Sequence, residues 1–138
     1  MMQIPGSTPM RLGIGGFYLV MAGINIGVVV SDSETYRHFA DQGLFSFVRD
    51  GWLNIVMAAP GLWIGLLAAG EIAIGIALLA GRRRWTLAGY TAIIAFHLAL
   101  VLFGWWILVW SGPVLLLMAL VLRRESLRRH GTKDPAIQ

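Results

Sequence analysis

The stretch GLWIGLLAAGEIAIGIALLAGRRR, residues 61–84, contains the pattern that decides the fold. Within it, Glu71 is the sole charged residue before three consecutive arginines, which begin at Arg82. At a rise of about 1.5 Å per residue, such a run forms a helix long enough to cross a ~30 Å hydrocarbon core. Arginines directly after an apolar helix are typical of a membrane surface. We therefore interpret residues 61–80 as a transmembrane helix.

The rest of the 138-residue chain has the same character. It is 57% hydrophobic and only 13% charged, with a mean hydropathy of +0.72. Soluble domains carry roughly 25% charged residues, so much of this surface must face lipid. Three further apolar runs predict spans at about 12–30, 85–108 and 113–129. Residues 1–130 are then one all-α, four-span membrane bundle, followed by a disordered cytoplasmic tail at 131–138.

The turn between the third and fourth spans has two candidate positions. Gly104 is one, and the tripeptide Ser111-Gly112-Pro113 is the other. We favour the tripeptide, because Gly-Pro is a strong breaker and proline suits the first turn of a new helix.

The basic residues set the orientation. With four spans, nine of them fall on one side and only Arg37 and Arg49 on the other. The nine are Arg11, Arg82, Arg83, Arg84, Arg123, Arg124, Arg128, Arg129 and Lys133. Because cytoplasmic loops carry the excess of lysine and arginine, both termini are predicted to be cytoplasmic. Charges confined to segment ends indicate topology signals or lipid anchors, and not a nucleic-acid surface.

Residues 31–60 form more than a linker. Between positions 36 and 48, apolar residues recur at helical spacing while polar residues fill the opposite face, and only Phe45 breaks the pattern. This pattern predicts an amphipathic helix that lies in the outer interface or caps the bundle. A partly ordered loop is the alternative.

Small residues predict how the spans pack. Gly23 and Gly27 are spaced for close helix contact in the first span, and Gly61 and Gly65 in the second. Such small-xxx-small pairs let membrane helices approach closely, within one chain or between two copies.

Glu71 is the most informative single residue, because it lies near the middle of its span. A carboxylate at that depth costs several kcal/mol unless it is paired, hydrated or protonated, so it faces the bundle interior. It can handle protons or anchor a ligand, or it can simply hold helices together by hydrogen bonds.

His97 lies at a similar depth. It is roughly 18 Å along its helix from Trp85, and the short arginine turn makes the two spans antiparallel neighbours. Glu71 and His97 are therefore a candidate proton-handling pair. Tyr90 shares a face with His97, and Tyr18 and Asn25 share a face of the first span. These five residues predict one buried ligand-binding site, which opens on the outer side.

Several kinds of chemistry are not expected. The chain has no cysteine, which excludes disulfides, thiolate metal sites and iron–sulfur clusters. One intramembrane histidine cannot supply a bis-histidine haem, and one Glu with one His is too few ligands for zinc or di-iron. We predict no metal site, no covalently bound cofactor, and no catalytic constellation in this chain alone.

The stretch from Tyr36 to Arg83 resembles a known pattern. An aromatic-rich loop precedes Glu71-x3-Gly75-x2-Leu78-Leu79-x-Gly81, and arginines and a third span follow. This is similar to the DoxX-like family of small four-helix membrane proteins, over roughly residues 11–122. Glu71 matches a family position, whereas Asn25 stands near the place where many members have a lysine. The resemblance implies association with redox enzymes, since some relatives are subunits of thiosulfate:quinone oxidoreductase and others join oxidative-stress complexes.

We therefore expect an accessory or quinone-facing subunit of a redox complex in a bacterial plasma membrane. Quinone is the expected ligand, and the expected partners are the bilayer, other membrane or peripheral redox subunits, or a second copy of the chain. Two alternatives stay open. One is a structural or assembly subunit without chemistry, and the other is a small proton-coupled transporter.

Overall fold

The computed structural model describes residues 8–130, apart from the side chains at 105–108, 110, 122 and 124–130. The predicted tail at 131–138 lies outside the described residues. All elements of the described part are helical and none is a strand, which confirms the all-α class there. The elements are α1 (Thr8–Ser31), η1 (Ser33–Gln42), α2 (Ser46–Gly51), η2 (Trp52–Val56), α3 (Pro60–Leu79), α4 (Arg83–Leu100), η3 (Val101–Phe103) and α5 (Trp105–His130).

Three of the described helices are long and apolar enough to cross a membrane. They are Thr8–Ser31, Pro60–Leu79 and the continuous helical stretch Arg83–Phe103. In α5, the described apolar stretch is shorter and runs over Ser111–Val121. The protein is thus a membrane protein by helix length and composition.

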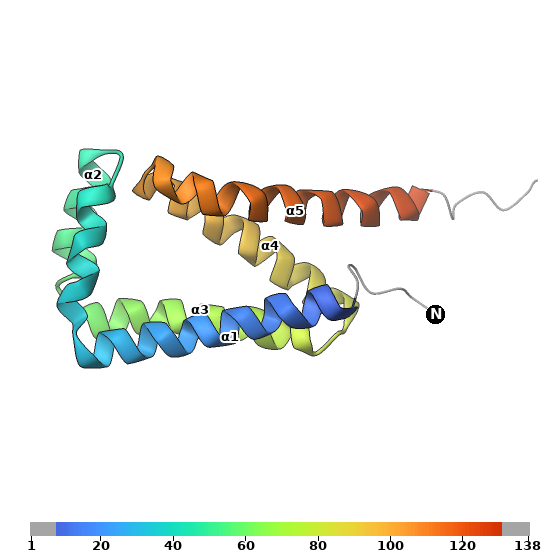
Figure 1. Cartoon of the computed structure of the whole chain (residues 1–138), viewed down its shortest axis with the longest axis horizontal. Coiled ribbons are helices and arrows are strands. Elements are labelled where there is room, and N and C mark those ends of the chain that lie inside the picture. The colour runs from blue at the N-terminus through green and yellow to red at the C-terminus, as the bar shows by residue number, and fades with distance from the viewer. Residues whose placement is uncertain (1–7, 131–138) are drawn as a thin grey trace, which may run out of the picture.

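Helices α1 and α3 lie side by side and antiparallel (Figure 1). Their closest approach is at Gly15 and Gly75. A Cβ atom built on Gly75 would lie 2.7 Å from Leu19 and 3.0 Å from the carbonyl oxygen of Gly15. These two glycines allow the backbones to touch, as small residues do in membrane helix pairs.

The glycines predicted to make this contact are different ones. A Cβ on Gly23, Gly27, Gly61 or Gly65 would meet nothing within 4 Å. These pairs therefore make no close helix contact within the described part of the chain, and contact between two copies stays a prediction. Spacing alone does not reveal which face of a helix meets its neighbour. Gly23 and Gly27 on α1, and Gly61 and Gly65 on α3, thus lie outside the close contact between the two helices.

One end of the α1–α3 pair is closed by a buried arginine. The Arg11 guanidinium donates to the carbonyl oxygens of Leu78 and Leu79 at the last turn of α3, and Arg11 is only 7% exposed. A cation at a helix C-terminus satisfies carbonyls that have no partner within the helix and complements the helix dipole. Gly81 follows with a φ of 68°, and a Cβ there would lie 3.0 Å from the guanidinium. We call this the arginine end.

The turn before α5 is at Gly104, so the favoured position at Ser111-Gly112-Pro113 was wrong. Gly104 has a φ of 122°, which glycine adopts freely, and Pro113 lies inside α5. The contacts of the neighbouring loop explain the choice, since Leu44 N donates to Leu102 O at 2.9 Å. Transmembrane helices tolerate an internal proline more readily than soluble ones.

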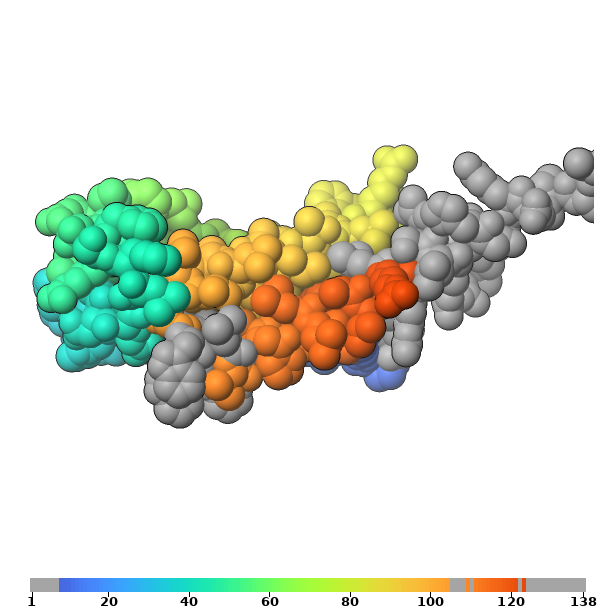
Figure 2. Space-filling model, turned by 90° about the horizontal axis from the view of Figure 1, so that it is seen from above, coloured from blue at the N-terminus to red at the C-terminus, as the bar shows by residue number. Residues whose placement is uncertain are grey.

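Residues 33–56, which we call the cap, cross the other end of the α1–α3 pair (Figures 1 and 2). The prediction of one amphipathic helix holds only in part, because the cap consists of a 3₁₀ helix, a short α-helix and a π-helical turn. The chain leaves the helical conformation at Gly43 and again at Phe45, both extended. Tyr36 and Ala40, four residues apart, are the buried residues of η1. We call this side of the molecule the cap end.

Candidate ligand-binding site

A cavity of about 550 Å³, partly open to the outside, lies at the cap end between helices from both halves of the chain. Its walls are mainly aromatic and aliphatic, and its few polar side chains come from α1, the cap, α3, α4 and α5. The lining residues are Phe17, Tyr18, Met21, Asn25, Tyr36, Phe39, Trp52, Val56, Trp63, Ile64, Leu67, Glu71, Phe96, His97, Ala99, Leu100, Phe103 and Ser111.

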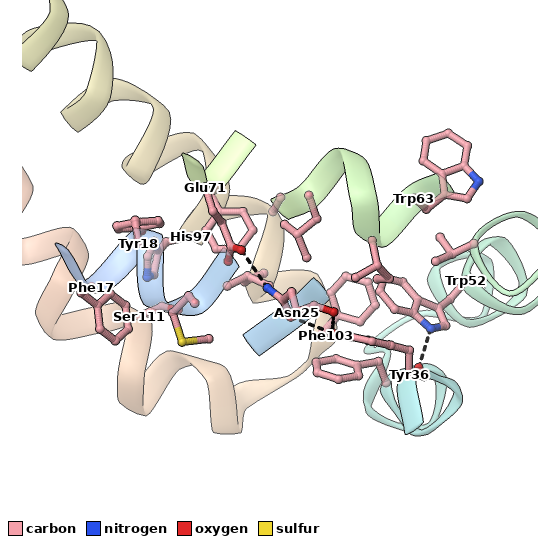
Figure 3. A pocket seen from close by; sticks show the side chains of 18 residues that line it. Phe17, Tyr18, Asn25, Tyr36, Trp52, Trp63, Glu71, His97, Phe103 and Ser111 are labelled. Atoms are coloured by element: carbon pink, nitrogen blue, oxygen red, sulfur yellow. Dashed lines mark hydrogen bonds between the residues drawn. The ribbon is translucent and has the colours of Figure 1, made fainter. Parts of the chain in front are cut away.

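A chain of hydrogen bonds crosses this cavity and joins three elements (Figure 3). Asn25 Nδ2 on α1 donates to Glu71 Oε2 on α3 at 2.8 Å. The Tyr36 hydroxyl in the cap donates to Asn25 Oδ1 at 2.7 Å. The Asn25 amide thus uses its donor toward the carboxylate and its acceptor toward the hydroxyl, which is the arrangement that satisfies both partners.

Glu71 is 4% exposed, so its carboxyl group is shielded from lipid by the surrounding helices. Intramembrane carboxyl groups face the bundle interior in this way because hydrocarbon cannot solvate them. Among the described residues, Asn25 is the hydrogen-bond partner of Glu71, and the bond engages Oε2. Oε1 has no hydrogen-bond partner in the part of the chain that the structure describes, and it can take a ligand or a proton.

The cap wall of the cavity is held by aromatic contacts. Trp52 Nε1 donates to the carbonyl oxygen of Tyr36 at 2.8 Å. The Tyr36 and Phe39 rings stack at 6.0 Å, and the Trp52 ring meets Phe103 edge-on at 5.0 Å. Burial raises the pKa of the Tyr36 hydroxyl, and the negative charge of Glu71 raises it further. Tyr36 is therefore a neutral hydrogen-bond donor at physiological pH.

The predicted contact between Glu71 and His97 is replaced by other pairings. Both residues line the cavity, but His97 Nδ1 lies 2.9 Å from the carbonyl oxygen of Ile93, one turn back on α4, while Glu71 pairs with Asn25. A carbonyl can only accept, so Nδ1 carries the proton, and Nε2 of a neutral ring is an acceptor. The prediction from the sequence rested on the equal depth of Glu71 and His97 along their helices. Equal depth brings two residues to one level, but it does not determine their hydrogen-bond partners.

The two predicted tyrosines have different environments. Tyr18 is 4% exposed and lines the cavity beside Glu71 and His97 (Figure 3). Tyr90 is fully buried in the apolar core with Leu78 and Ile93, and it is not among the cavity residues. Neither tyrosine hydroxyl has a hydrogen-bond partner among the described residues.

Four of the five predicted site residues, Tyr18, Asn25, Glu71 and His97, therefore meet at one cavity. Sequence reasoning missed Tyr36 and Ser111 as members of it. Tyr36 belonged to the recognised apolar face of the loop, but nothing in the pattern indicated that its hydroxyl reaches Asn25. Ser111 was assigned to a turn, and its place inside α5 brings it to the cavity wall.

The arrangement suits a ligand with a flat, moderately polar head. Binding cavities of this size are typically apolar with a few polar groups that fix orientation. The comparisons with known proteins add nothing to this geometry, because no family model, no curated protein and no solved structure matches the chain.

Proposed function

We propose that the chain is a four-span subunit of a redox complex in a bacterial plasma membrane, and that its cavity binds a quinone head group. The observation that carries the proposal is the Glu71–Asn25–Tyr36 chain inside an aromatic cavity. A quinone head is flat and apolar on its faces, and its two oxygens require hydrogen-bonding groups at its edge.

The polar groups suit the two redox forms of such a head. Quinone oxygens accept hydrogen bonds, and a protonated Glu71 supplies a donor. Quinol hydroxyls donate hydrogen bonds, and ionised Glu71 or neutral His97 supplies an acceptor. In the proposed complex the partner redox subunits would supply or take the two electrons, and Glu71 would pass the accompanying protons by changing its protonation state within the cavity.

Topology supports the membrane part of the proposal. Three described helices are long enough to cross, and α5 returns alongside α4 from Gly104 (Figure 1). If α5 is the fourth span, the nine basic residues gather on one face, and both termini are cytoplasmic. The cap then lies on the outer side.

The test is a quinone titration of the purified protein in nanodiscs, followed by tryptophan fluorescence. Trp52 and Trp63 line the cavity, so a bound quinone should quench them. Glu71→Gln should weaken binding about tenfold or more, because it replaces a charged or ionisable hydrogen-bonding group. Glu34→Gln, at an exposed carboxylate of the cap, is the matched control and should bind like wild type. Equal quenching in all three proteins, or none in any, would contradict the proposal.

One observation favours a second candidate, a purely structural or assembly subunit. The Asn25 amide satisfies groups on α3 and in the cap, as a lock between elements would. A lock predicts that Glu71→Gln lowers the melting temperature in detergent and leaves quinone affinity unchanged. The quinone site predicts weaker quinone binding in Glu71→Gln, whatever the effect of this variant on the melting temperature.

A further inference from the structure

A second hollow of about 430 Å³ lies between α3 and α4, and we call it the trough. Small residues from both helices form much of its surface, among them Ala73 on α3 and Ala88 and Ala92 on α4. Trp85, near the start of α4, lies at the arginine end of the trough. Of the described residues that line it, Glu71 alone carries a charged side chain.

The trough arises because α3 and α4 touch at one end and diverge toward the other. Near the arginine end, a Cβ on Gly89 would lie 3.0 Å from Leu78, so the helices are in close contact there. From that contact α4 rises away from α3 toward the cap end (Figure 1). Small side chains on the facing surfaces leave the resulting space open.

The trough borders the cavity at the cap end. Leu67, Glu71 and Phe96 line both spaces, so the two share a wall at the carboxyl group. Along α3 the trough extends over residues 66–77, about 16 Å at the helical rise. That length is roughly half of a ~30 Å hydrocarbon core, and it leads away from the cap.

We propose that the cavity and the trough form one site for a ligand with a single hydrocarbon chain. The polar head lies beside Glu71, and the chain runs along the α3–α4 trough toward Trp85. This inference rests on the proposed function for the nature of the head, a quinone, and adds that the chain is bound by the protein. None of the described residues that line either space is a lysine or an arginine, and Glu71 would repel a phosphate, so a phospholipid head does not fit this lining.

The test uses two photoreactive quinones in nanodiscs, one with the reactive group on the head and one with it at the chain end. Cross-linked peptides are mapped by mass spectrometry. The head probe should label residues around Glu71 and His97, and the chain-end probe should label Ala88, Ala92 or Trp85. If the head probe labels the cavity while the chain-end probe labels lipid-facing residues at random, this inference fails and the proposed function stands. If the head probe labels nothing above background, the proposed function fails.

A pair of matched variants sharpens the result. Ala92 lines the trough, whereas Ala95, also exposed and one turn further along α4, lines neither space. Ala92→Phe should abolish labelling by the chain-end probe and preserve labelling by the head probe, and Ala95→Phe should change neither. Equal effects of the two variants would overturn the inference.

The inference that a ligand's hydrocarbon chain fills the trough would also be overturned if one of two other occupants were found there. One is a second copy of the chain, shown if Ala92→Phe but not Ala95→Phe dissociates an oligomer in native mass spectrometry. The other is bulk lipid, shown if a phospholipid with a photoreactive acyl chain labels Ala92 and an excess of quinone does not compete.

Discussion

The two ends of the helix assembly differ in how closely their helices pack. At the arginine end, α1 and α3 touch backbone to backbone at Gly15 and Gly75, and Arg11 closes the last turn of α3. At the cap end, α4 has moved away from α3, and a cavity of about 550 Å³ is spanned by the hydrogen bonds of Asn25. One end is close-packed and the other is hollow.

This difference in packing suggests that the arginine end serves the stability of the fold and the cap end serves ligand binding. Close packing of small residues holds membrane helices together without a hydrophobic drive, so the arginine end is expected to carry most of the stability. A polar chain inside a hollow contributes less and offers groups to a ligand. Substitutions at the arginine end should therefore act on folding, and substitutions in the cavity should act on binding.

The largest expected effect is that of Gly75→Val. Its side chain would collide with Leu19 and with the backbone of Gly15, and overpacking of this kind costs about 1–3 kcal/mol. Gly65→Val introduces the same residue into the same helix, where a Cβ meets nothing within 4 Å. Thermal unfolding in detergent should show a much lower melting temperature for Gly75→Val than for Gly65→Val. Similar melting temperatures would mean that the glycine contact does not hold the helices.

The second largest loss of stability is expected when the Arg11 guanidinium is removed. Arg11→Gln removes charged hydrogen bonds to two helix carbonyls, worth about 2 kcal/mol in a buried setting. Arg84→Gln removes the same charge from an exposed side chain of the neighbouring basic cluster. The comparison of their melting temperatures separates capping of α3 from a general effect of charge, and equal values would refute the capping role.

The sequence was sufficient to bring four of the five predicted residues to one cavity, because position along a helix follows from residue number. Counting 1.5 Å per residue from the helix ends brought Glu71 and His97 to one level, and Asn25 toward the outer end of the first span. The rotation of each helix about its axis cannot be counted in this way. For that reason Asn25, and not His97, was found as the partner of Glu71, and Tyr90 was found in the core.

The irregular parts of the fold depended on contacts between distant residues. Gly104 and Pro113 are both possible helix breakers in the sequence, and the bond from Leu44 to Leu102 accompanies the break at Gly104. The cap showed a helical pattern, but its division at Gly43 could not be inferred from periodicity. Tyr36 joined the site through the folding of that cap over Asn25.

At the cap end, a smaller loss is expected from Tyr36→Phe. It removes the 2.7 Å hydrogen bond to Asn25 and should cost about 1 kcal/mol. Tyr18→Phe removes a hydroxyl that lacks a partner among the described residues, and its cost should be near zero. Hydrogen exchange should report faster opening of residues 33–42 in Tyr36→Phe alone. Equal exchange in the two variants would show that the hydroxyl does not fasten the cap.

The smallest effect concerns the exposed pair in the cap. Arg37 Nε lies 2.6 Å from Glu34 Oε2, and this hydrogen bond holds the pKa of Glu34 below its ordinary value of 4.5. Because the folded pKa is the lower one, the contribution to stability is complete above the ordinary value and is lost as the pH falls through the lowered one. A carboxyl NMR titration should show Glu34 returning to its ordinary pKa in Arg37→Gln but not in Arg49→Gln. An unchanged midpoint in Arg37→Gln would exclude the pairing.

We propose that the hollow end holds a quinone at Glu71. Extraction of the protein from its native membrane in polymer-bounded discs tests this proposal most directly. Mass spectrometry then identifies the bound small molecules and the proteins that copurify. The account predicts stoichiometric quinone with wild type and with Glu34→Gln, loss of that quinone with Glu71→Gln, and redox subunits in the complex. A protein that emerges alone or with copies of itself, and with no more quinone than the surrounding lipid in any variant, would contradict it.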